Sequence, residues 1–258
     1  MANSKSWEKI FNDHKILKND FNKQPFHLSA EQIKRSVQNF KKTAEKEVRI
    51  LCKIDSREDL PAIMSDNGLF LLPVKNGKYA IIKGEGFVDI PDIKSNAANY
   101  NSKLDFELRS SKIGDSEMQH LDFAYASSLI RTFMNDPKLV LTIRGRKYTP
   151  EFSFMVNSQK ITISSVQTEV DAGYESDQSI VLVEAKNSKT KNIIIRQLYY
   201  PYRQWTKNTG KYVSLLFFEK RKNEYHIWQY GFGDKNDYNS IKLIKSARYI
   251  IKDKIIQR

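Results

Sequence analysis

The run Ser179–Lys186 (SIVLVEAK) constrains the fold more than any other segment of the chain. Its apolar and β-branched residues predict a strand buried inside a sheet, with charged residues at its end. Side chains alternate along a strand, so Glu184 and Lys186 point to the same face. The chain is therefore expected to form a sheet that carries an acid and an amine together at one edge.

A second strand-like run, Lys160–Asp171, brings another carboxylate into reach, and Asp171 is expected at its end, before Ala172 and Gly173. If the two strands pair, the carboxylates of Asp171 and Glu184 converge on one hard cation, and Mg²⁺ favours such oxygen ligands. Lys186 beside that cation would orient or deprotonate a water and stabilise charge on a phosphate. The alternative is three unrelated charges on solvated strand ends, and the pattern alone leaves it open.

The order of the remaining elements indicates the architecture. A helix is predicted over Ser116–Met134, strands over Leu139–Arg144 and Glu151–Val156, a helix over Asn192–Lys207, and strands over Tyr212–Glu219 and Tyr225–Gly231. The two strands that carry the charged residues lie between these groups. Such an order predicts an α/β (α+β) fold with a mixed sheet flanked by helices.

This order, with VDAGY followed by VEAK and then IIIRQLYYPYRQW, resembles the PD-(D/E)xK nucleases, and more narrowly type II restriction endonucleases. The resemblance covers Ile113 to about Gly233. It implies that Asp171 and Glu184 are ligands of Mg²⁺, that the carbonyl of Ala185 completes the coordination, and that Lys186 is the catalytic amine. Val170 stands where the family name has proline, and many such enzymes lack that proline.

Two further acids are candidates. Glu117, at the start of the first predicted helix of the core, matches a position where related nucleases place an acid that contacts the metal through water. The alternative is a plain charge at a helix N-terminus. Glu169 shares a strand face with Asp171, and it is either a further ligand or an exposed strand carboxylate.

The charge of the chain favours a polyanionic partner, because Lys and Arg number 43 against 30 Asp and Glu, giving a net charge of +13. Two groups are predicted to contact double-stranded DNA. The group on the helix after the Glu184 strand consists of Arg196, Gln197, Tyr200, Arg203 and Lys207, with Pro201 expected to kink or restart that helix. The group at a strand end consists of Arg144, Arg146 and Lys147, for which a solvated basic turn is the alternative.

The chain is divided into an N-terminal module over residues 1–84, a linker over 85–112 and a catalytic domain over 113–258. In the module, a helix around Trp7 precedes a second helix capped by Ser29, and a strand is expected over Glu47–Ile54. A third helix over Ser56–Asp66 and a hairpin over Leu69–Ile82, turning at Asn76 and Gly77, follow. This pattern fits a winged helix that reads DNA, and equally a small α+β scaffold that braces the catalytic domain.

The predicted function is that of a type II restriction endonuclease, which makes sequence-specific, Mg²⁺-dependent double-strand cuts and leaves 5′-phosphate and 3′-hydroxyl ends, as the resemblance implies. A homodimer and a companion DNA methyltransferase are the expected partners. A repair or modification-dependent endonuclease with the same core, and a noncatalytic DNA-binding regulator, are the alternatives.

Other features narrow the class of protein. The single Cys52 excludes an internal disulfide framework. The chain has no long apolar run, and its first residues, MANSKSWEKIF, contain no hydrophobic segment. The sequence therefore predicts a cytoplasmic protein without a membrane span.

Overall fold

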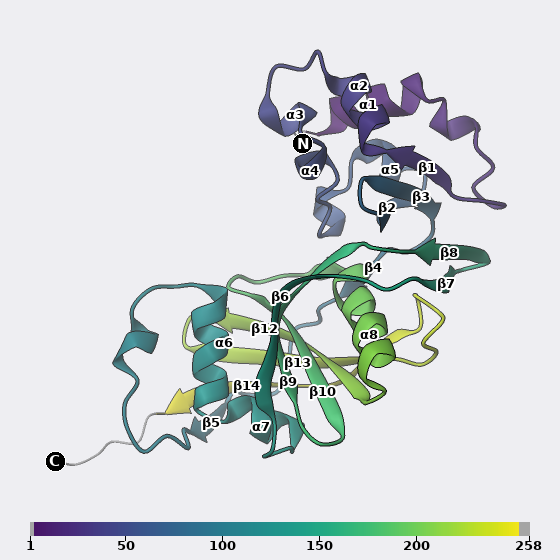
Figure 1. Ribbon diagram of the computed structural model, residues 1–258. Helices are drawn as coiled ribbons and strands as arrows, with labels where there is room; N and C mark the ends of the chain where they lie inside the picture. Colours follow the sequence, from purple (N-terminus) through teal and green to yellow (C-terminus); the bar gives the residue numbers. More distant parts are fainter. Residues whose placement is uncertain (1–2, 253–258) are drawn as a thin grey trace.

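The computed structural model describes residues 3–252, and Figure 1 shows a small N-terminal part seated on a larger part that contains a broad sheet. The helices of the N-terminal part are α1 (Ser4–Asp13), α2 (Ala30–Val37), α3 (Thr43–Lys46), α4 (Val48–Leu51) and α5 (Ala62–Ser65). Its strands are β1 (Phe26–Ser29), β2 (Leu69–Lys75) and β3 (Lys78–Lys83). These strands pair antiparallel in the order β1-β3-β2.

Local signals of the N-terminal sequence are partly confirmed. The Ser29 hydroxyl accepts a hydrogen bond from the backbone N–H of Gln32 at 3.1 Å, and the Gln32 side chain accepts one from the Ser29 N–H at 2.8 Å, which is the predicted capping box. The hairpin β2–β3 turns at Gly77, whose φ of 70° is readily adopted by glycine.

Two predicted elements of the N-terminal part are wrong. The expected strand over Glu47–Ile54 is the helical turn α4, because Leu51 is buried and its carbonyl accepts a hydrogen bond from Trp7 Nε1 at 3.2 Å. Packing against Trp7 overrides the strand preference of the β-branched residues. The expected helix over Ser56–Asp66 is divided at Pro61 into a 3₁₀ turn, η2 (Arg57–Asp59), and α5.

The large part is built on a mixed sheet, which among the described residues has seven strands in the order β5-β14-β13-β12-β10-β9-β6. Its strands are β5 (Ala98–Asn101), β6 (Val140–Tyr148), β9 (Gln167–Glu175), β10 (Ser179–Lys186), β12 (Tyr212–Arg221), β13 (Glu224–Phe232) and β14 (Ile241–Lys252). The pairs β10–β12 and β14–β5 are parallel, and the others are antiparallel. The bounds of β10 are those predicted from the sequence.

Helices cover both faces of this sheet (Figure 1). Helices α6 (Glu117–Ala126) and α7 (Leu129–Met134) bury Leu121 and Phe133 with Val181 and Val183 of β10 on one face. Helix α8 (Arg196–Thr209) buries Leu198 with Leu182 on the other. The predicted mixed sheet flanked by helices is therefore confirmed, and so is the alternation of side chains along β10.

Some boundaries differ from those expected. The single helix predicted over Ser116–Met134 is broken at Ser128, whose φ is 68°, into α6 and α7. The run predicted as one strand over Lys160–Asp171 is divided between β8 (Gln159–Ile163) and β9, with Ser165 at φ 54° between them. Helix α8 runs through Pro201 without restarting, and Gly210, at φ 68°, follows its last residue.

The segment predicted as a linker, residues 85–112, contains two strands. Strand β4 (Phe87–Asp89) pairs with β11 (Asn192–Ile194), and β5 pairs with β14 at the edge of the large sheet. Strand β11 takes up the first residues of the run predicted as a helix from Asn192. The chain between the two parts is therefore integrated into the large part by backbone hydrogen bonds.

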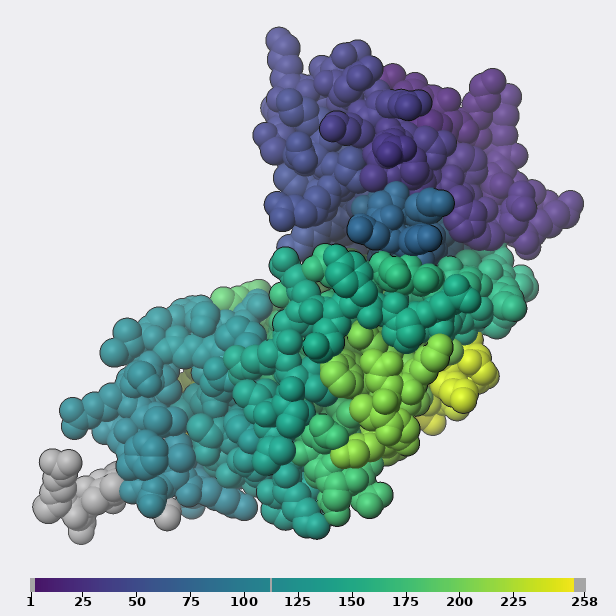
Figure 2. Space-filling view, viewed as in Figure 1, coloured from purple at the N-terminus to yellow at the C-terminus, as the bar shows by residue number. Residues whose placement is uncertain are grey.

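The two parts share one apolar core. The hairpin formed by β7 (Phe152–Val156) and β8 lies between them, and its Phe154 belongs to the same buried cluster as Leu72 of β2 and Tyr199 of α8. The backbone N–H of Ser164 also donates to the Val74 carbonyl at 3.0 Å. Figure 2 shows the N-terminal part in direct contact with the segment around residue 150.

Candidate active site

Strands β9 and β10 bring Asp171 and Glu184 to neighbouring positions. Their antiparallel register pairs Leu182 with Gly173 and Val183 with Ala172, so the next pair along the strands is Glu184 and Asp171. The Asp171 carboxylate accepts a hydrogen bond from the backbone N–H of Ala185, with Oδ2 2.7 Å from the nitrogen. The pairing of the two strands, on which the predicted convergence depends, is therefore present.

Asp171 does not end its strand, as the sequence suggested, because β9 continues to Glu175. The pairing of β6 with β9 is irregular at this point: Ile143 pairs with Gly173 and Gly145 with Val170, so β9 uses three steps where β6 uses two. Such a bulge changes the direction of a side chain beside it. Gly173 is required for close packing, since a Cβ there would lie 2.6 Å from the Cβ of Ile143.

Lys186 lies within the same group of polar atoms. Its Nζ donates to Glu184 Oε1 at 2.5 Å and to the Ala185 carbonyl at 3.0 Å. Gln197, in the first turn of α8, donates through Nε2 to the same Oε1 of Glu184 at 3.0 Å. The acid, the amine and the α8 glutamine therefore form one hydrogen-bonded cluster.

Burial controls the electrostatics of this cluster. Only 8% of Glu184 is exposed, and burial together with the charges of Asp171 and Asp55 raises the pKa of its carboxyl to about 7, against the opposing effect of Lys186. Burial also raises the pKa of Asp171. Burial disfavours the Lys186 ammonium, but the charges of Glu184, Asp171 and Glu117 outweigh it and raise the pKa of Lys186.

The two further acids differ in their surroundings. Glu117 is the first residue of α6, and its charge raises the pKa of both Asp171 and Lys186, which places it beside the cluster. Glu169 also raises the pKa of Asp171, but its carboxylate accepts from Arg146 Nε at 3.2 Å and its side chain is 58% exposed.

The donor atoms fit a hard divalent cation. Among residues 3–252 there is no group of three or more His, Cys, Asp or Glu side chains that could hold a metal ion. The predicted site has a different composition, with two carboxylates and the carbonyl oxygen of Ala185. Two of these oxygens, Glu184 Oε1 and the Ala185 carbonyl, accept hydrogen bonds from the Lys186 ammonium.

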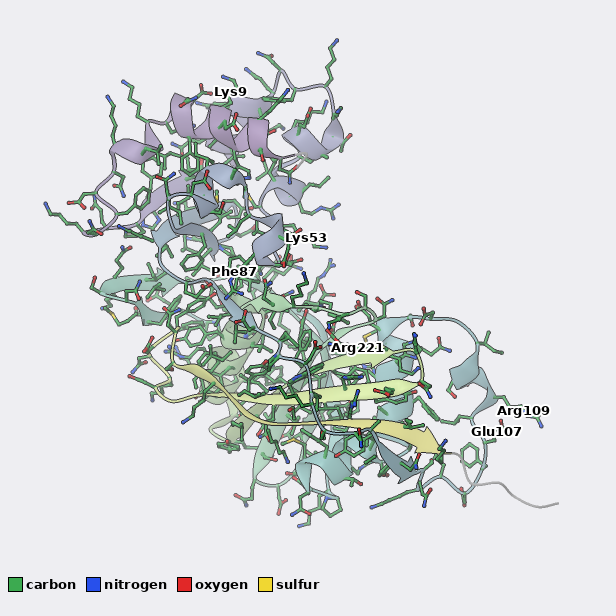
Figure 3. All side chains as sticks on the ribbon, turned by 180° about the vertical axis from the view of Figure 1, so that it is seen from behind. Lys9, Lys53, Phe87, Glu107, Arg109 and Arg221 are labelled. Atoms are coloured by element: carbon green, nitrogen blue, oxygen red, sulfur yellow. The ribbon has the colours of Figure 1, made fainter. Side chains whose placement is uncertain are left out.

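A pocket of about 380 Å³ opens beside Lys186 at the junction of the two parts. It is lined by Asp55, Ser56, Glu58, Lys186, Lys189, Thr190, Lys191, Asn192, Ile193 and Gln197. Figure 3 labels Lys53 and Phe87 close to this junction. The N-terminal part thus forms one wall of the pocket, and the segment that follows Lys186 forms the other.

The residues of α8 predicted to contact DNA do not share an open basic face. Tyr200 is 1% exposed and its hydroxyl donates to the Pro73 carbonyl at 3.0 Å, because the N-terminal hairpin packs on this side of the helix. Arg196 pairs with Asp55 at 3.4 Å, and Arg203 donates to the Lys235 carbonyl at 2.7 Å. Lys207 remains exposed near the end of the helix, where its Nζ donates to a backbone carbonyl.

The other predicted DNA contacts lie on β6, at the edge of the large sheet, and all are at least partly exposed. Arg144 forms an ion pair with Asp122, and Arg146 pairs with Glu169. Lys147 is exposed beside them. Gly145 has a φ of 78°, so this basic segment is a distorted part of a strand rather than a turn.

Sequence reasoning missed the contribution of the N-terminal part to the site. The charge of Asp55 raises the pKa of Glu184, and Asn192 is buried against Arg57 and Glu58. These residues lie more than a hundred positions apart in the chain, as the separation of 135 between Arg57 and Asn192 illustrates. No local pattern signals such a contact.

The fold and the site define a mixed α+β protein with a large mixed sheet flanked by helices and an acid–lysine cluster on two of its strands. Residues 82–250 match a family described as a domain of unknown function (DUF6997), and the chain belongs to that family. Residues 4–81 match a second such family, DUF6996, and the two matches meet within β3. No curated protein and no solved structure matches the chain significantly.

Among residues 3–252, no helix is both long and apolar enough to cross a membrane.

Proposed function

We propose that the protein is a Mg²⁺-dependent endodeoxyribonuclease of the type II restriction class with a PD-(D/E)xK core. The observation that carries this proposal is the cluster itself. Asp171 on β9 accepts a hydrogen bond from the Ala185 N–H of β10, and Lys186 Nζ lies 2.5 Å from Glu184 Oε1. The resemblance of VDAGY, VEAK and RQLYYPYR to that superfamily points to the same residues.

The ionisation of the cluster indicates how Lys186 acts. In the absence of a bound cation, the charges of Glu184, Asp171 and Glu117 raise the pKa of Lys186. A protonated Lys186 would stabilise negative charge on the scissile phosphate. An ammonium can also orient a water by donating a hydrogen bond. Abstraction of a proton from water by the neutral amine is the alternative role, and it would require Mg²⁺ at the carboxylates to lower the pKa of Lys186.

The carboxylates of Asp171 and Glu184 and the carbonyl of Ala185 would hold Mg²⁺. When bound, the ion supplies Lewis-acid polarisation of the phosphate and activation of water. Gln197 holds Glu184 by a hydrogen bond at 3.0 Å and leaves its Oε2 free of that contact. Glu117 adds negative charge at the start of α6 and strengthens the attraction of the site for a cation.

The charge of +13 supports double-stranded DNA as the substrate. Arg144, Arg146 and Lys147 on the edge strand, with Lys207 at the end of α8, are the predicted contacts whose side chains lie at the surface. Cleavage of both strands requires two sites, so we propose a homodimer, with a DNA methyltransferase as the companion that protects host DNA. The cytoplasm is the proposed location.

Observations support each of the two roles considered for the N-terminal part, which are DNA binding and bracing of the catalytic domain. The helices of the N-terminal part, followed by the hairpin β2–β3, support a winged-helix-like module that binds DNA. The contacts of η2 with the large part favour a brace, because Arg57 pairs with Asp89 and Glu58 bonds to Asn192. An N-terminal part that braces the large part, and that also carries basic residues on its surface for DNA, satisfies both observations.

The test is digestion of unmethylated plasmid and phage DNA with Mg²⁺, followed by sequencing of the ends. Discrete fragments with 5′-phosphates are expected from the wild type and from Lys138→Ala, whose lysine is 69% exposed and pairs with Asp177. Lys186→Ala should bind DNA without cutting it. DNA binding without cleavage by the wild type would favour a noncatalytic regulator, and cutting confined to modified or damaged DNA would favour a repair or modification-dependent enzyme.

A further inference from the structure

The connection from Lys186 to α8 is held by two separate groups of residues. On the side of the large part, the Thr190 N–H donates to the buried carboxylate of Glu219 at 2.8 Å, and Lys189 pairs with Asp92 at 2.8 Å. On the other side, the Ile194 N–H donates to the Asp55 carbonyl at 2.9 Å. The N-terminal part therefore holds the strand that leads from the catalytic lysine.

Asn192 is the side chain through which this contact is made. It is only 4% exposed, and both polar atoms of its amide are used by the N-terminal part. Its Oδ1 accepts from the backbone N–H of Arg57 at 2.7 Å, and its Nδ2 donates to Glu58 Oε2 at 3.0 Å. A buried amide satisfied in both directions fixes one orientation of the two segments, because a shift would leave a donor or an acceptor unpaired.

The same edge of the N-terminal part reaches the acid–lysine cluster. Asp55 pairs with Arg196, which precedes Gln197, and Gln197 donates to Glu184. Asp55 and Glu58 also line the pocket that opens beside Lys186. Contacts made by residues 55–58 therefore hold the connection at its α8 end, and the pocket that they line extends to Lys186.

We infer that Asn192, held by Arg57 and Glu58, is a positioning residue through which the N-terminal part sets the orientation of Lys186 and Gln197 at Glu184. The kinetic part of this inference rests on the proposed nuclease function, and the structural part does not. Misplacement of a catalytic group by about 1 Å is enough to lower a rate by about a hundredfold.

The first experiment measures backbone hydrogen exchange across residues 184–197 in the full chain. Asn192→Ala should increase exchange there, whereas Asn157→Gly should leave it unchanged. Asn157 is the control, because its Nδ2 also crosses between the two parts, to the Lys83 carbonyl at 3.3 Å, and glycine readily keeps its φ of 52°. Equal exchange in the two variants overturns the inference, whatever the activity of the protein.

The second experiment compares DNA cleavage by Glu58→Ala and Glu58→Gln. Glu58 is exposed, so neither change threatens folding, and glutamine keeps an oxygen that accepts from Asn192 Nδ2. Alanine should lower kcat about tenfold to a hundredfold with KM for DNA unchanged, and glutamine should restore it. A change in KM alone in the alanine variant would contradict positioning and indicate a DNA contact by Glu58.

The two experiments separate the failure of each proposal. A wild type that cuts no DNA, combined with faster exchange in Asn192→Ala, would refute the nuclease and leave the positioning contact in place. Cleavage by the wild type, combined with unaltered exchange and kcat in the Asn192 and Glu58 variants, would refute the positioning role alone.

Discussion

The ammonium of Lys186 lies 2.5 Å from Oε1 of Glu184, two positions earlier on the same face of β10. It also contacts the Ala185 carbonyl at 3.0 Å, so it touches two of the three groups proposed to hold Mg²⁺. The lysine and a divalent cation therefore compete for the same oxygens. If Mg²⁺ binds as proposed, Lys186 would have to give up its contact with Glu184 Oε1.

Replacement of Lys186 by methionine should separate cation binding from cleavage. Because the variant loses a positive charge within a few Å of the site, it should bind Ca²⁺ about tenfold more tightly than the wild type. Titration calorimetry measures this affinity. Lys138→Met should leave the affinity unchanged, and a weaker affinity in Lys186→Met would show that the lysine does not oppose the ion.

The stability of the protein should depend on the ionisation of Glu184. Burial raises the pKa of this carboxyl from 4.5 to about 7, so between these values the folded state binds more protons than the unfolded state. The contribution of Glu184 to stability is therefore present at low pH and is lost as the pH rises through this window. Urea unfolding of the wild type and of Glu184→Gln, at pH 5 and pH 8 without divalent ions, measures the effect.

The glutamine variant should gain stability relative to the wild type as the pH increases, since it has no proton to lose. Addition of Ca²⁺ at pH 8 should stabilise the wild type and have little effect on Glu184→Gln. A difference between the two proteins that does not vary with pH would place the carboxyl outside the buried environment described above.

Substitution of Gly173 by alanine should disturb the strand pair that carries Asp171. The added Cβ would lie 2.6 Å from the Ile143 Cβ, which is too close for two carbon atoms. Overpacking of this kind costs about 1–3 kcal/mol. The double variant Gly173→Ala/Ile143→Gly removes the clashing Cβ, so its loss of stability should be smaller than the sum of the two single losses, as measured by urea unfolding.

Tyr200 tests whether the two parts unfold together. Its ring lies in the core shared by the N-terminal part and α8, and Tyr200→Ala should cost about 3–5 kcal/mol. Tyr200→Phe, which loses only the hydrogen bond to Pro73, should cost about 1 kcal/mol. If the two parts unfold together, unfolding followed by circular dichroism and by tryptophan fluorescence should give one coincident transition. Two separate transitions would show that the parts unfold independently.

The sequence predicted the elements whose signal is local. Strand β10, the capping box at Ser29 and the turn at Gly77 depend on neighbouring residues, and all were found as expected. The proximity of Asp171 to Glu184 followed from the assumption that their strands pair. The bulge beside Asp171 did not follow from that assumption, because it arises from the pairing of β9 with β6.

Features that depend on distant contacts could not be predicted. The four residues of α4 prefer a strand by composition, but burial of Leu51 against Trp7 makes them helical. The burial of Tyr200 and the pairing of Arg196 with Asp55 follow from where the N-terminal part docks. A helical period shows which residues of α8 share a face, but it does not show what covers that face.

The apolar cluster that contains Leu72, Phe154 and Tyr199 fastens the N-terminal part to the β7–β8 hairpin and to α8, and α8 in turn packs on the strands that carry Asp171 and Glu184. On the proposed function, a duplex that touched the N-terminal part and these strands would meet two surfaces joined through packed side chains, and the curvature needed to fit them would come from the nucleic acid. Sequences that bend easily would then be favoured even at base pairs that no side chain reaches.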